Sequence, residues 1–171
     1  MMDRDVLFYN GALFENEIAR YLKQHFSDIE VLVNLRLFSS YLRKDTQIDV
    51  VAICSFGVFV IEAKNWKQWI KGEYNDRYWA GKSKSKDAMR VFNVVAQNFI
   101  HVRALRNRLR ALGFEPVKFN SIVCVPDGTE IISRCTEVCN LSSLALKMNR
   151  QSKINTVSID IAEYKKVISM V

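Results

Sequence analysis

Residues 48–64, with the sequence IDVVAICSFGVFVIEAK, decide the fold of this chain. Two β-rich runs, Ile48–Cys54 and Val58–Lys64, flank the short turn Ser55-Phe56-Gly57, and this pattern predicts a β-hairpin. Neither run alternates cleanly between apolar and polar residues, which is typical of strands covered on both faces. Charges inside such runs are usually paired or functional. The runs contain three of them: Asp49, Glu62 and Lys64.

Alternation of side chains along the second run places Glu62 and Lys64 on the same face of its strand. If Ser55 and Phe56 form the tip of the hairpin, Asp49 lies directly across from Glu62, with the two Cβ atoms roughly 4.5–5.5 Å apart. A register shifted by one residue would put the two carboxylates on opposite faces, so the prediction depends on this tip. The expected arrangement is two facing carboxylates with a lysine beside them.

This arrangement has a chemical use and a purely structural alternative. Hard divalent cations such as Mg²⁺ or Mn²⁺ take oxygen ligands, commonly from one or two carboxylates, and activate water for attack on a phosphoryl group. Lys64 would orient or help deprotonate that water, or stabilise the developing negative charge. The alternative is a surface salt-bridge cluster, in which each exposed pair contributes about 0–1 kcal/mol. The apolar runs around the charges favour the functional interpretation.

The sequence before the hairpin predicts a helix and then a strand. Apolar residues recur at helical spacing over Leu13–Phe26, and Glu15 falls inside the apolar stripe. A carboxylate on a buried face costs free energy unless it is paired, hydrogen-bonded or bound to a metal. A strand is expected over Val31–Phe38 and a loop over residues 39–44.

The sequence after the hairpin continues the mixture of strands and helices. An extended excursion or small hairpin is expected over Ile70–Ala80. A long helix is expected to begin at Asp87 or Asn93 and to end at Leu112, before Gly113 in the position that glycine prefers. The weaker signals are a strand over Val117–Val125, a short strand within 131–140, and two helices, over Ser142–Arg150 and Ile161–Met170.

This order of elements predicts a mixed α/β fold with a central mixed β-sheet flanked by helices. At 171 residues the chain is expected to form a single domain that buries its own core. The core of that domain would span about residues 10–125, and residues 126–171 would form a C-terminal extension.

The net charge of +7 suits a polyanionic partner, because each neutralised phosphate releases counterions. Many basic domains are merely soluble, so charge alone does not separate nucleic-acid binding from that alternative. No stretch is long and apolar enough to span a bilayer, so no membrane partner is expected. The N-terminal acids, Asp3 and Asp5, differ from a secretory signal, and we expect an intracellular, cytoplasmic protein.

The four cysteines agree with a reducing compartment. Cys54 and Cys124 lie in strand-like apolar runs, where free cysteine behaves as a small buried hydrophobe. Cys135 and Cys139 are four residues apart and have no second pair, so ordinary cysteines are favoured over a zinc site. A disulfide framework is less favoured still.

Four segments, in order along the chain, share their pattern with a known family. They are Gly11–Leu22, Thr46–Val51, Gly57–Asn65 and Asn93–Asn98. Together they resemble the nuclease-related domain (NERD) family, which has the PD-(D/E)xK or restriction-endonuclease-like fold, over roughly residues 10–125. Each segment is a weak signal alone, but four in order at suitable spacing are fairly specific.

The resemblance implies a set of catalytic residues: Glu15, Asp49, Glu62, Lys64 and Gln97. Asp49 and Glu62 would hold Mg²⁺ or Mn²⁺, with the carbonyl of Ala63 and the carboxylate of Glu15 as further ligands. Lys64 would be the catalytic lysine. Gln97 would lie near the metal or the scissile phosphate, although without the resemblance it is equally well an ordinary exposed glutamine.

The implied activity is metal-dependent hydrolysis of phosphodiester bonds in DNA, with RNA as an open alternative. Gln47 stands where the family usually has a glutamate, and Val94 replaces the usual proline. We expect Gln47 to face away from the site. Its presence supports a second interpretation, a catalytically weak module of the same fold that binds nucleic acid or a protein partner.

Several further residues could contact a nucleic acid. Four of them form a basic group before the long helix: Lys82, Lys84, Lys86 and Arg90. We expect the lysines to touch phosphates, against the equal alternative of a solvated loop. Trp66, Trp69 and Trp79 could stack on bases, although packing over the base of the hairpin is favoured. Restriction-like folds often act as dimers because two strands must be cut, so a homodimer is an open option.

Overall fold

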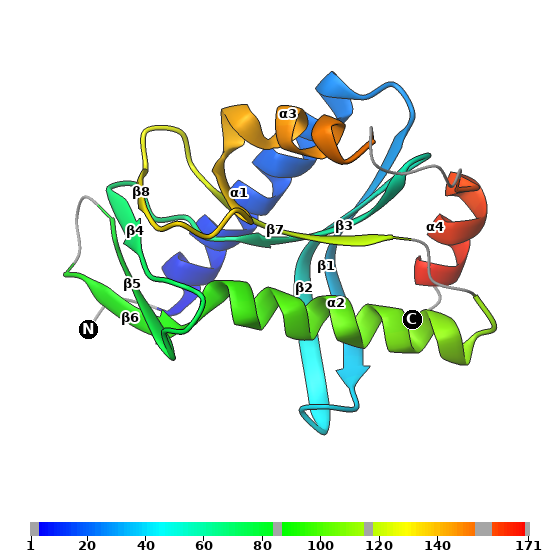
Figure 1. The fold of residues 1–171 in the computed structure, drawn as a ribbon, viewed down its shortest axis with the longest axis horizontal. Helices are drawn as coiled ribbons and strands as arrows, with labels where there is room; N and C mark the ends of the chain where they lie inside the picture. The colour runs from blue at the N-terminus through cyan, green and yellow to red at the C-terminus, as the bar shows by residue number, and fades with distance from the viewer. Residues whose placement is uncertain (1–3, 84–86, 115–117, 153–158, 170–171) are drawn as a thin grey trace.

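The computed structural model describes residues 4–83, 87–114, 118–152 and 159–169, and within them the central sheet has the strand order β1-β2-β3-β7-β9 (Figure 1). Its strands are β1 (Ile29–Ser39), β2 (Lys44–Cys54), β3 (Gly57–Ala63), β7 (Phe119–Val125) and β9 (Val138–Asn140). The first three pair antiparallel, and β3, β7 and β9 pair parallel. The sheet is therefore mixed, and this confirms the predicted fold class.

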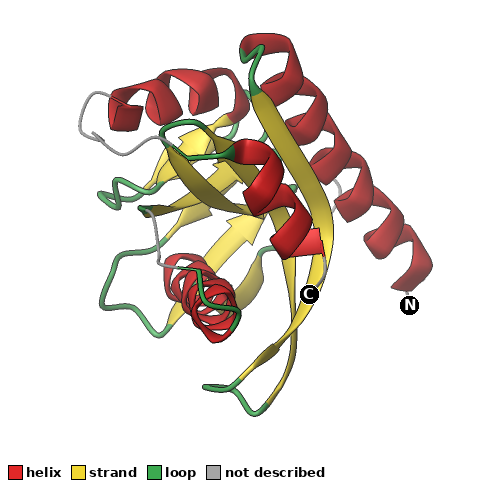
Figure 2. Ribbon diagram, turned by 90° about the vertical axis from the view of Figure 1, so that its right-hand side faces the viewer, coloured by secondary structure: helices red, strands yellow, loops and turns green. Residues whose placement is uncertain are grey.

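Helices cover both faces of this sheet (Figures 1 and 2). Their bounds are α1 (Arg4–His25), α2 (Val94–Ala111), α3 (Leu141–Ser152) and α4 (Ile161–Ser169). β3 shows how the faces divide, because Phe59 and Ile61 pack with α1 and α3, whereas Val58 and Val60 pack with α2 and α4. The alternation along this strand is the one that the sequence predicted. None of the helices in the described part of the chain is long and apolar enough to cross a membrane.

Asn93 decides where the long helix begins. Its side-chain oxygen accepts hydrogen bonds from the backbone N–H groups of Val95 and Ala96, both at 3.0 Å, as an N-cap does. Of the two starts that the sequence allowed, the one at Asn93 is confirmed. The residues before it form a short strand, β6 (Met89–Phe92), which the sequence did not indicate.

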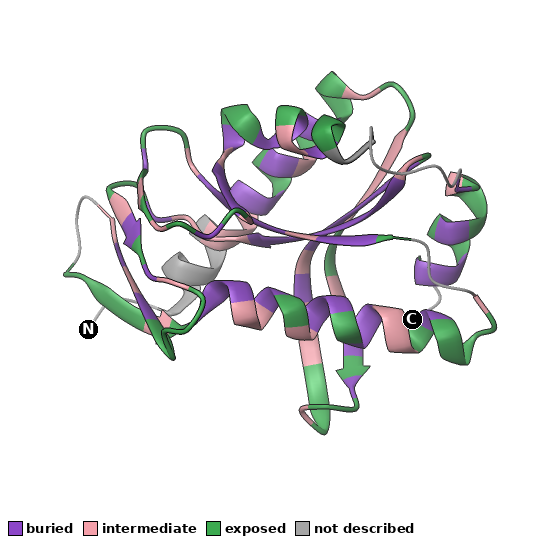
Figure 3. Cartoon of the chain, viewed as in Figure 1, coloured by how far each residue is buried: buried purple, intermediate pink, exposed green. Residues whose placement is uncertain are grey.

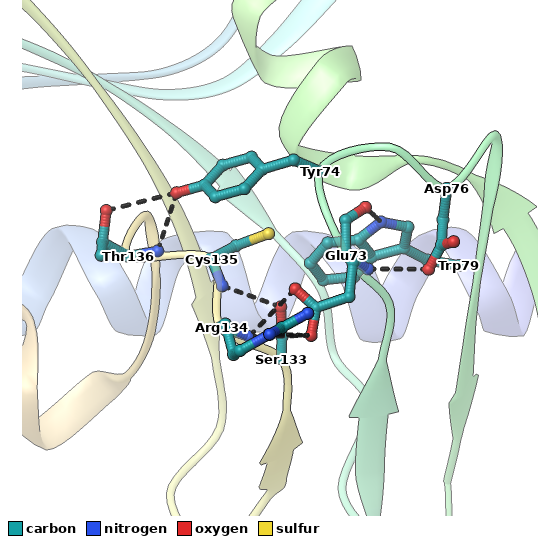
Figure 4. Close-up of polar contacts among 8 residues, drawn as sticks. All are labelled: Glu73, Tyr74, Asp76, Trp79, Ser133, Arg134, Cys135 and Thr136. Atoms are coloured by element: carbon teal, nitrogen blue, oxygen red, sulfur yellow. Dashed lines mark hydrogen bonds and ion pairs between the residues drawn. The ribbon is translucent and has the colours of Figure 1, made fainter.

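A second sheet of order β6-β5-β4-β8 lies beside the first, with β4 (Trp69–Lys71), β5 (Tyr78–Lys82) and β8 (Glu130–Ile132). β4 and β5 form the small hairpin expected after residue 70. Trp66 and Trp79 are buried in a cluster that also contains residues of β4, β7 and α2, which confirms packing over stacking for these two tryptophans. Figure 4 shows how polar contacts around Glu73 and Tyr74 join the loop after β4 to the loop after β8.

The β1–β2 hairpin is longer than its sequence suggests. The loop expected over residues 39–44 is a tighter turn at residues 40–43, and β2 begins at Lys44. The end of this hairpin, residues 36–47, is called the β1–β2 arm below. It projects beyond α2, and much of its surface is exposed (Figures 1 and 3).

Candidate active site

The register between β2 and β3 brings Asp49 to Glu62. Cys54 pairs with Gly57 and Val50 pairs with Ile61, so the hairpin turns at the predicted tip. One further step in this register places Asp49 opposite Glu62. The backbone ladder stops before that step, and the Ala63 N–H donates instead to the Asp49 carboxylate at 2.8 Å.

Glu62 lies at the bottom of the site, with 1% of its surface exposed. The Lys64 Nζ donates to its Oε1 at 2.5 Å, and His101 Nδ1 lies 3.2 Å from its Oε2. The imidazole is within ion-pair distance of that oxygen but is not aligned for a hydrogen bond. Burial raises the pKa of Glu62, but the Lys64 ammonium and His101 together outweigh burial and hold the pKa below its ordinary value.

Asp49 shows the opposite behaviour. Burial first and then the negative charge of Glu62 raise its pKa from the ordinary 3.8 to about 7, against the hydrogen bond from Ala63 and the charge of Lys64. Two facing carboxyls with pKa values pushed apart are typical of sites that hold a cation or a shared proton.

These groups line a cleft of about 880 Å³ between α1, the β1–β2 arm and the beginning of α2. The cleft brings together the whole predicted catalytic set: Glu15, Asp49, Glu62, Lys64 and Gln97. Glu15 is 8% exposed, as its place in the apolar stripe of the first helix predicted. The pKa of Glu15 lies above its ordinary value. Burial, followed by the negative charge of Glu62, raises this pKa and outweighs the hydrogen bond from Asn34, which lowers it.

His101 is the functional candidate that sequence reasoning missed. It is 4% exposed and reaches Glu62 from α2. A signal for it was present, because His101 follows Gln97 by four residues and therefore shares its face of the helix. His101 can orient the Glu62 carboxylate, as an outer partner of a metal ligand does.

Gln47 does not face away from the site, and this expectation was wrong. Gln47 lines the cleft, and its Nε2 donates to Asn34 Oδ1 at 2.6 Å. The expectation was at odds with the spacing, because Gln47 lies two residues before Asp49 and alternate residues of a strand share a face. The alternation also breaks around Asp49, since Ile48 packs on the α2 side of the sheet and Val50 on the α1 side. Asn34, the β1 residue across from this break, has φ 56°, a left-handed conformation that asparagine tolerates.

The donor set suits a hard divalent cation that keeps several waters. One carboxylate oxygen of Glu15 and one of Glu62 are buried without a hydrogen-bond partner. Within the described ranges, no three His, Cys, Asp or Glu side chains converge closely enough to hold a metal on their own. The arrangement thus fits Mg²⁺ or Mn²⁺ on two carboxylates, with water and backbone oxygens completing the shell.

Of the four basic residues expected to touch nucleic acid, the structure describes Lys82 and Arg90. Lys84 and Lys86 fall outside the described residues. Lys82 ends β5, and Arg90 in β6 places its guanidinium 4.3 Å from the centroid of the Tyr78 ring. Neither of these two lines the cleft.

The four cysteines are buried and free. Cys124 and Cys139 pair across the parallel strands β7 and β9 rather than joining Cys135 in a metal site. Cys54 in β2 and Cys124 in β7 are thus buried within their strands, as the sequence predicted.

Comparison with known proteins gives one family and one relative. The family model described as the nuclease-related domain matches residues 10–126, which is more than half of the chain. An uncharacterized protein of Bacillus anthracis is 36% identical over 76 residues, which cover 44% of this chain and 34% of that protein. The match thus spans about a third of the length of that relative. No solved structure matches the chain.

Proposed function

We propose that this chain, which belongs to the nuclease-related domain family, is a metal-dependent phosphodiesterase that acts on DNA. The observation that carries the proposal is the convergence of Asp49, Glu62 and Lys64 in one cleft. Membership in the family establishes only that the protein is nuclease-related. The hydrolytic reaction, its dependence on a divalent cation and DNA as its substrate are what we propose beyond that.

In the proposed reaction Asp49 and Glu62 would hold Mg²⁺ or Mn²⁺, with Glu15 and the Ala63 carbonyl as further oxygen donors. The cation, when bound, polarises the phosphoryl oxygen and activates a water. Lys64 orients that water and stabilises the negative charge that develops on the phosphate. Gln97, at the start of α2, positions the scissile phosphate.

The ionisation states of Asp49 and Glu62 support these roles. Glu62 stays negative because Lys64 and His101 hold its pKa low, whereas Asp49 has a pKa of about 7 in the empty cleft. Asp49 would lose its proton to solvent beside a bound cation, because positive charge favours the ionised carboxylate. Lys64 would then leave its contact with Glu62 for the substrate.

The test is a cleavage assay over linear, circular, single-stranded and branched DNA with Mg²⁺ or Mn²⁺. Lys64→Ala should lower the rate by about 100- to 1000-fold, the usual effect of removing one transition-state stabiliser. Lys71→Ala, an exposed lysine of β4 outside the cleft, is the matched control and should retain full activity. Equal activity of Lys64→Ala and the wild type would refute the proposal.

Gln47 favours a second candidate function, a catalytically weak module that binds nucleic acid or a partner. Gln47 supplies an amide where the family usually has a carboxylate, and this amide donates a hydrogen bond to the Asn34 side chain. Calorimetric titration with Mg²⁺ or Mn²⁺ discriminates between the two functions. A weak module should show no cation binding that is lost in Asp49→Ala or Glu62→Ala.

A further inference from the structure

Two exposed aromatic rings line the same cleft as the catalytic set. Tyr41, in the turn of the β1–β2 arm, is 60% exposed, and Phe92, at the end of β6, is 46% exposed. Single exposed aromatic residues are common on protein surfaces. These two come from segments far apart in the sequence and line one cleft, together with Asp49, Glu62 and Lys64.

Tyr41 is also held from outside the cleft. The guanidinium of Arg103, on α2, lies 5.0 Å from the centroid of the Tyr41 ring. A cation over an aromatic face stabilises the position of the ring by a modest amount. The ring thus has a partner within the protein and still leaves most of its surface to solvent.

We infer that the cleft receives an unpaired DNA strand whose bases stack on Tyr41 and Phe92 while its backbone lies over Asp49, Glu62 and Lys64. The inference rests on the proposed function and narrows its substrate to single strands and the single-stranded parts of branched DNA. Aromatic rings bind any base through its π-face, and in an intact duplex the neighbouring bases cover those faces.

The other side of the β1–β2 arm has a different character. A second groove of about 550 Å³ is lined by Arg36, Phe38 and Arg108, with Asp45 shared between the two grooves. Phe38 is 62% exposed, as much as Tyr41, but it lines this second groove and not the cleft. The arm therefore carries two comparable aromatic residues of which one faces the proposed active site.

The test measures binding with EDTA present, so that cleavage does not interfere. Fluorescence anisotropy compares a labelled single-stranded oligonucleotide with a duplex of the same sequence. Tyr41→Ala and Phe92→Ala should each weaken single-strand binding by about 5- to 150-fold and leave duplex binding nearly unchanged. Tyr41→Phe keeps the ring and should bind like the wild type, and Phe38→Ala is the matched control.

The result that overturns the inference is equal affinity of Tyr41→Ala and the wild type for the single strand, or an equal loss in Phe38→Ala. A parallel cleavage assay with Mg²⁺ separates this outcome from failure of the proposed function. A protein that binds single strands through the two rings but cleaves no DNA supports the stacking inference and refutes the phosphodiesterase. DNA cleavage by a protein whose single-strand affinity is unchanged by Tyr41→Ala supports the phosphodiesterase and refutes the stacking inference.

Discussion

Replacing Asp49 with asparagine should make the metal-free protein more stable while it abolishes cleavage. In the empty cleft the ionised Asp49 is buried beside a second negative carboxylate, Glu62, and both effects raise its pKa to about 7. An asparagine has no charge to bury, and its side-chain oxygen can still accept the hydrogen bond from Ala63. The substitution therefore removes the free-energy cost of the buried charge and keeps the hydrogen bond from the Ala63 N–H.

The magnitude follows from the two pKa values. A carboxyl whose pKa moves from 3.8 to about 7 on folding destabilises the ionised fold by up to about 4 kcal/mol, since each pKa unit corresponds to about 1.4 kcal/mol. The new amide hydrogens of asparagine, which need acceptors, reduce the gain by about 1–2 kcal/mol. We expect Asp49→Asn to raise the free energy of unfolding by about 2–3 kcal/mol at pH 8.

This gain should depend on pH in a defined direction. The unfolded chain ionises Asp49 above its ordinary pKa of 3.8, whereas the folded protein does so only above about 7. The wild type therefore loses stability as pH rises between these values, and its loss is constant above them. At pH 4.5 the advantage of Asp49→Asn should shrink to about 1 kcal/mol or less.

Urea denaturation followed by circular dichroism, with EDTA present, measures this difference. With a typical urea dependence of about 2 kcal/mol per molar, the midpoint at pH 8 should rise by about 1–1.5 M. Asp45→Asn, an exposed acid of the same strand, is the control and should change stability by less than about 0.5 kcal/mol. Mg²⁺ should stabilise the wild type and not Asp49→Asn, because only the wild type retains the proposed ligand.

Two results would refute this reasoning. The first is an Asp49→Asn protein that is no more stable than the wild type at pH 8, which would mean that the Asp49 carboxylate costs the fold nothing. The second is a gain of equal size at pH 8 and pH 4.5, which would assign the effect to packing rather than to ionisation.

Three further predictions concern the neighbours of the site. His101→Ala should lower cleavage by about 10- to 100-fold, as expected for a partner that orients a ligand, and a rate within twofold of the wild type would show that His101 has no such role. Asn98→Ala should destabilise the protein by about 3 kcal/mol in urea titrations, and unchanged stability would contradict this. The reason is that the buried Asn98 amide donates to the Val60 carbonyl at 2.8 Å and to the Ser121 hydroxyl and the Ile122 carbonyl at 2.9 Å each. Gln47→Glu should tighten Mg²⁺ binding in calorimetry and lower stability in EDTA, since it adds a negative charge to the cleft, and unaltered cation affinity would place residue 47 outside the metal's reach.

The hairpin of the site could be predicted from the sequence because its geometry is local. Two β-rich runs joined by a two-residue tip set the register, and alternation along each strand then sets which side chains face each other. Cys54 does pair with Gly57, and Glu62 and Lys64 do share a face. The anomaly of Glu15 was likewise local, because it follows from the helical spacing around it.

The parts that the sequence did not reveal depend on segments that meet only in three dimensions. His101 reaches Glu62 because α2 packs across β3, and no local pattern sets that distance. Around Asp49 the alternation of β2 breaks, since Ile48 and Val50 pack on opposite sides of the sheet, and the Gln47 amide reaches Asn34 on another strand. A period of two predicts faces only while the strand stays regular.

The sequence alone therefore determined the catalytic candidates on β2 and β3, since adjacent strands of one hairpin leave little freedom in where Asp49, Glu62 and Lys64 lie. The tertiary structure decided their surroundings: how deeply Glu62 is buried, which imidazole it faces, and how far the β1–β2 arm projects. It also brought Tyr41 and Phe92 to one cleft. Burial and long-range packing set pKa values and the shape of the cleft, and both arise from contacts between residues distant in the chain.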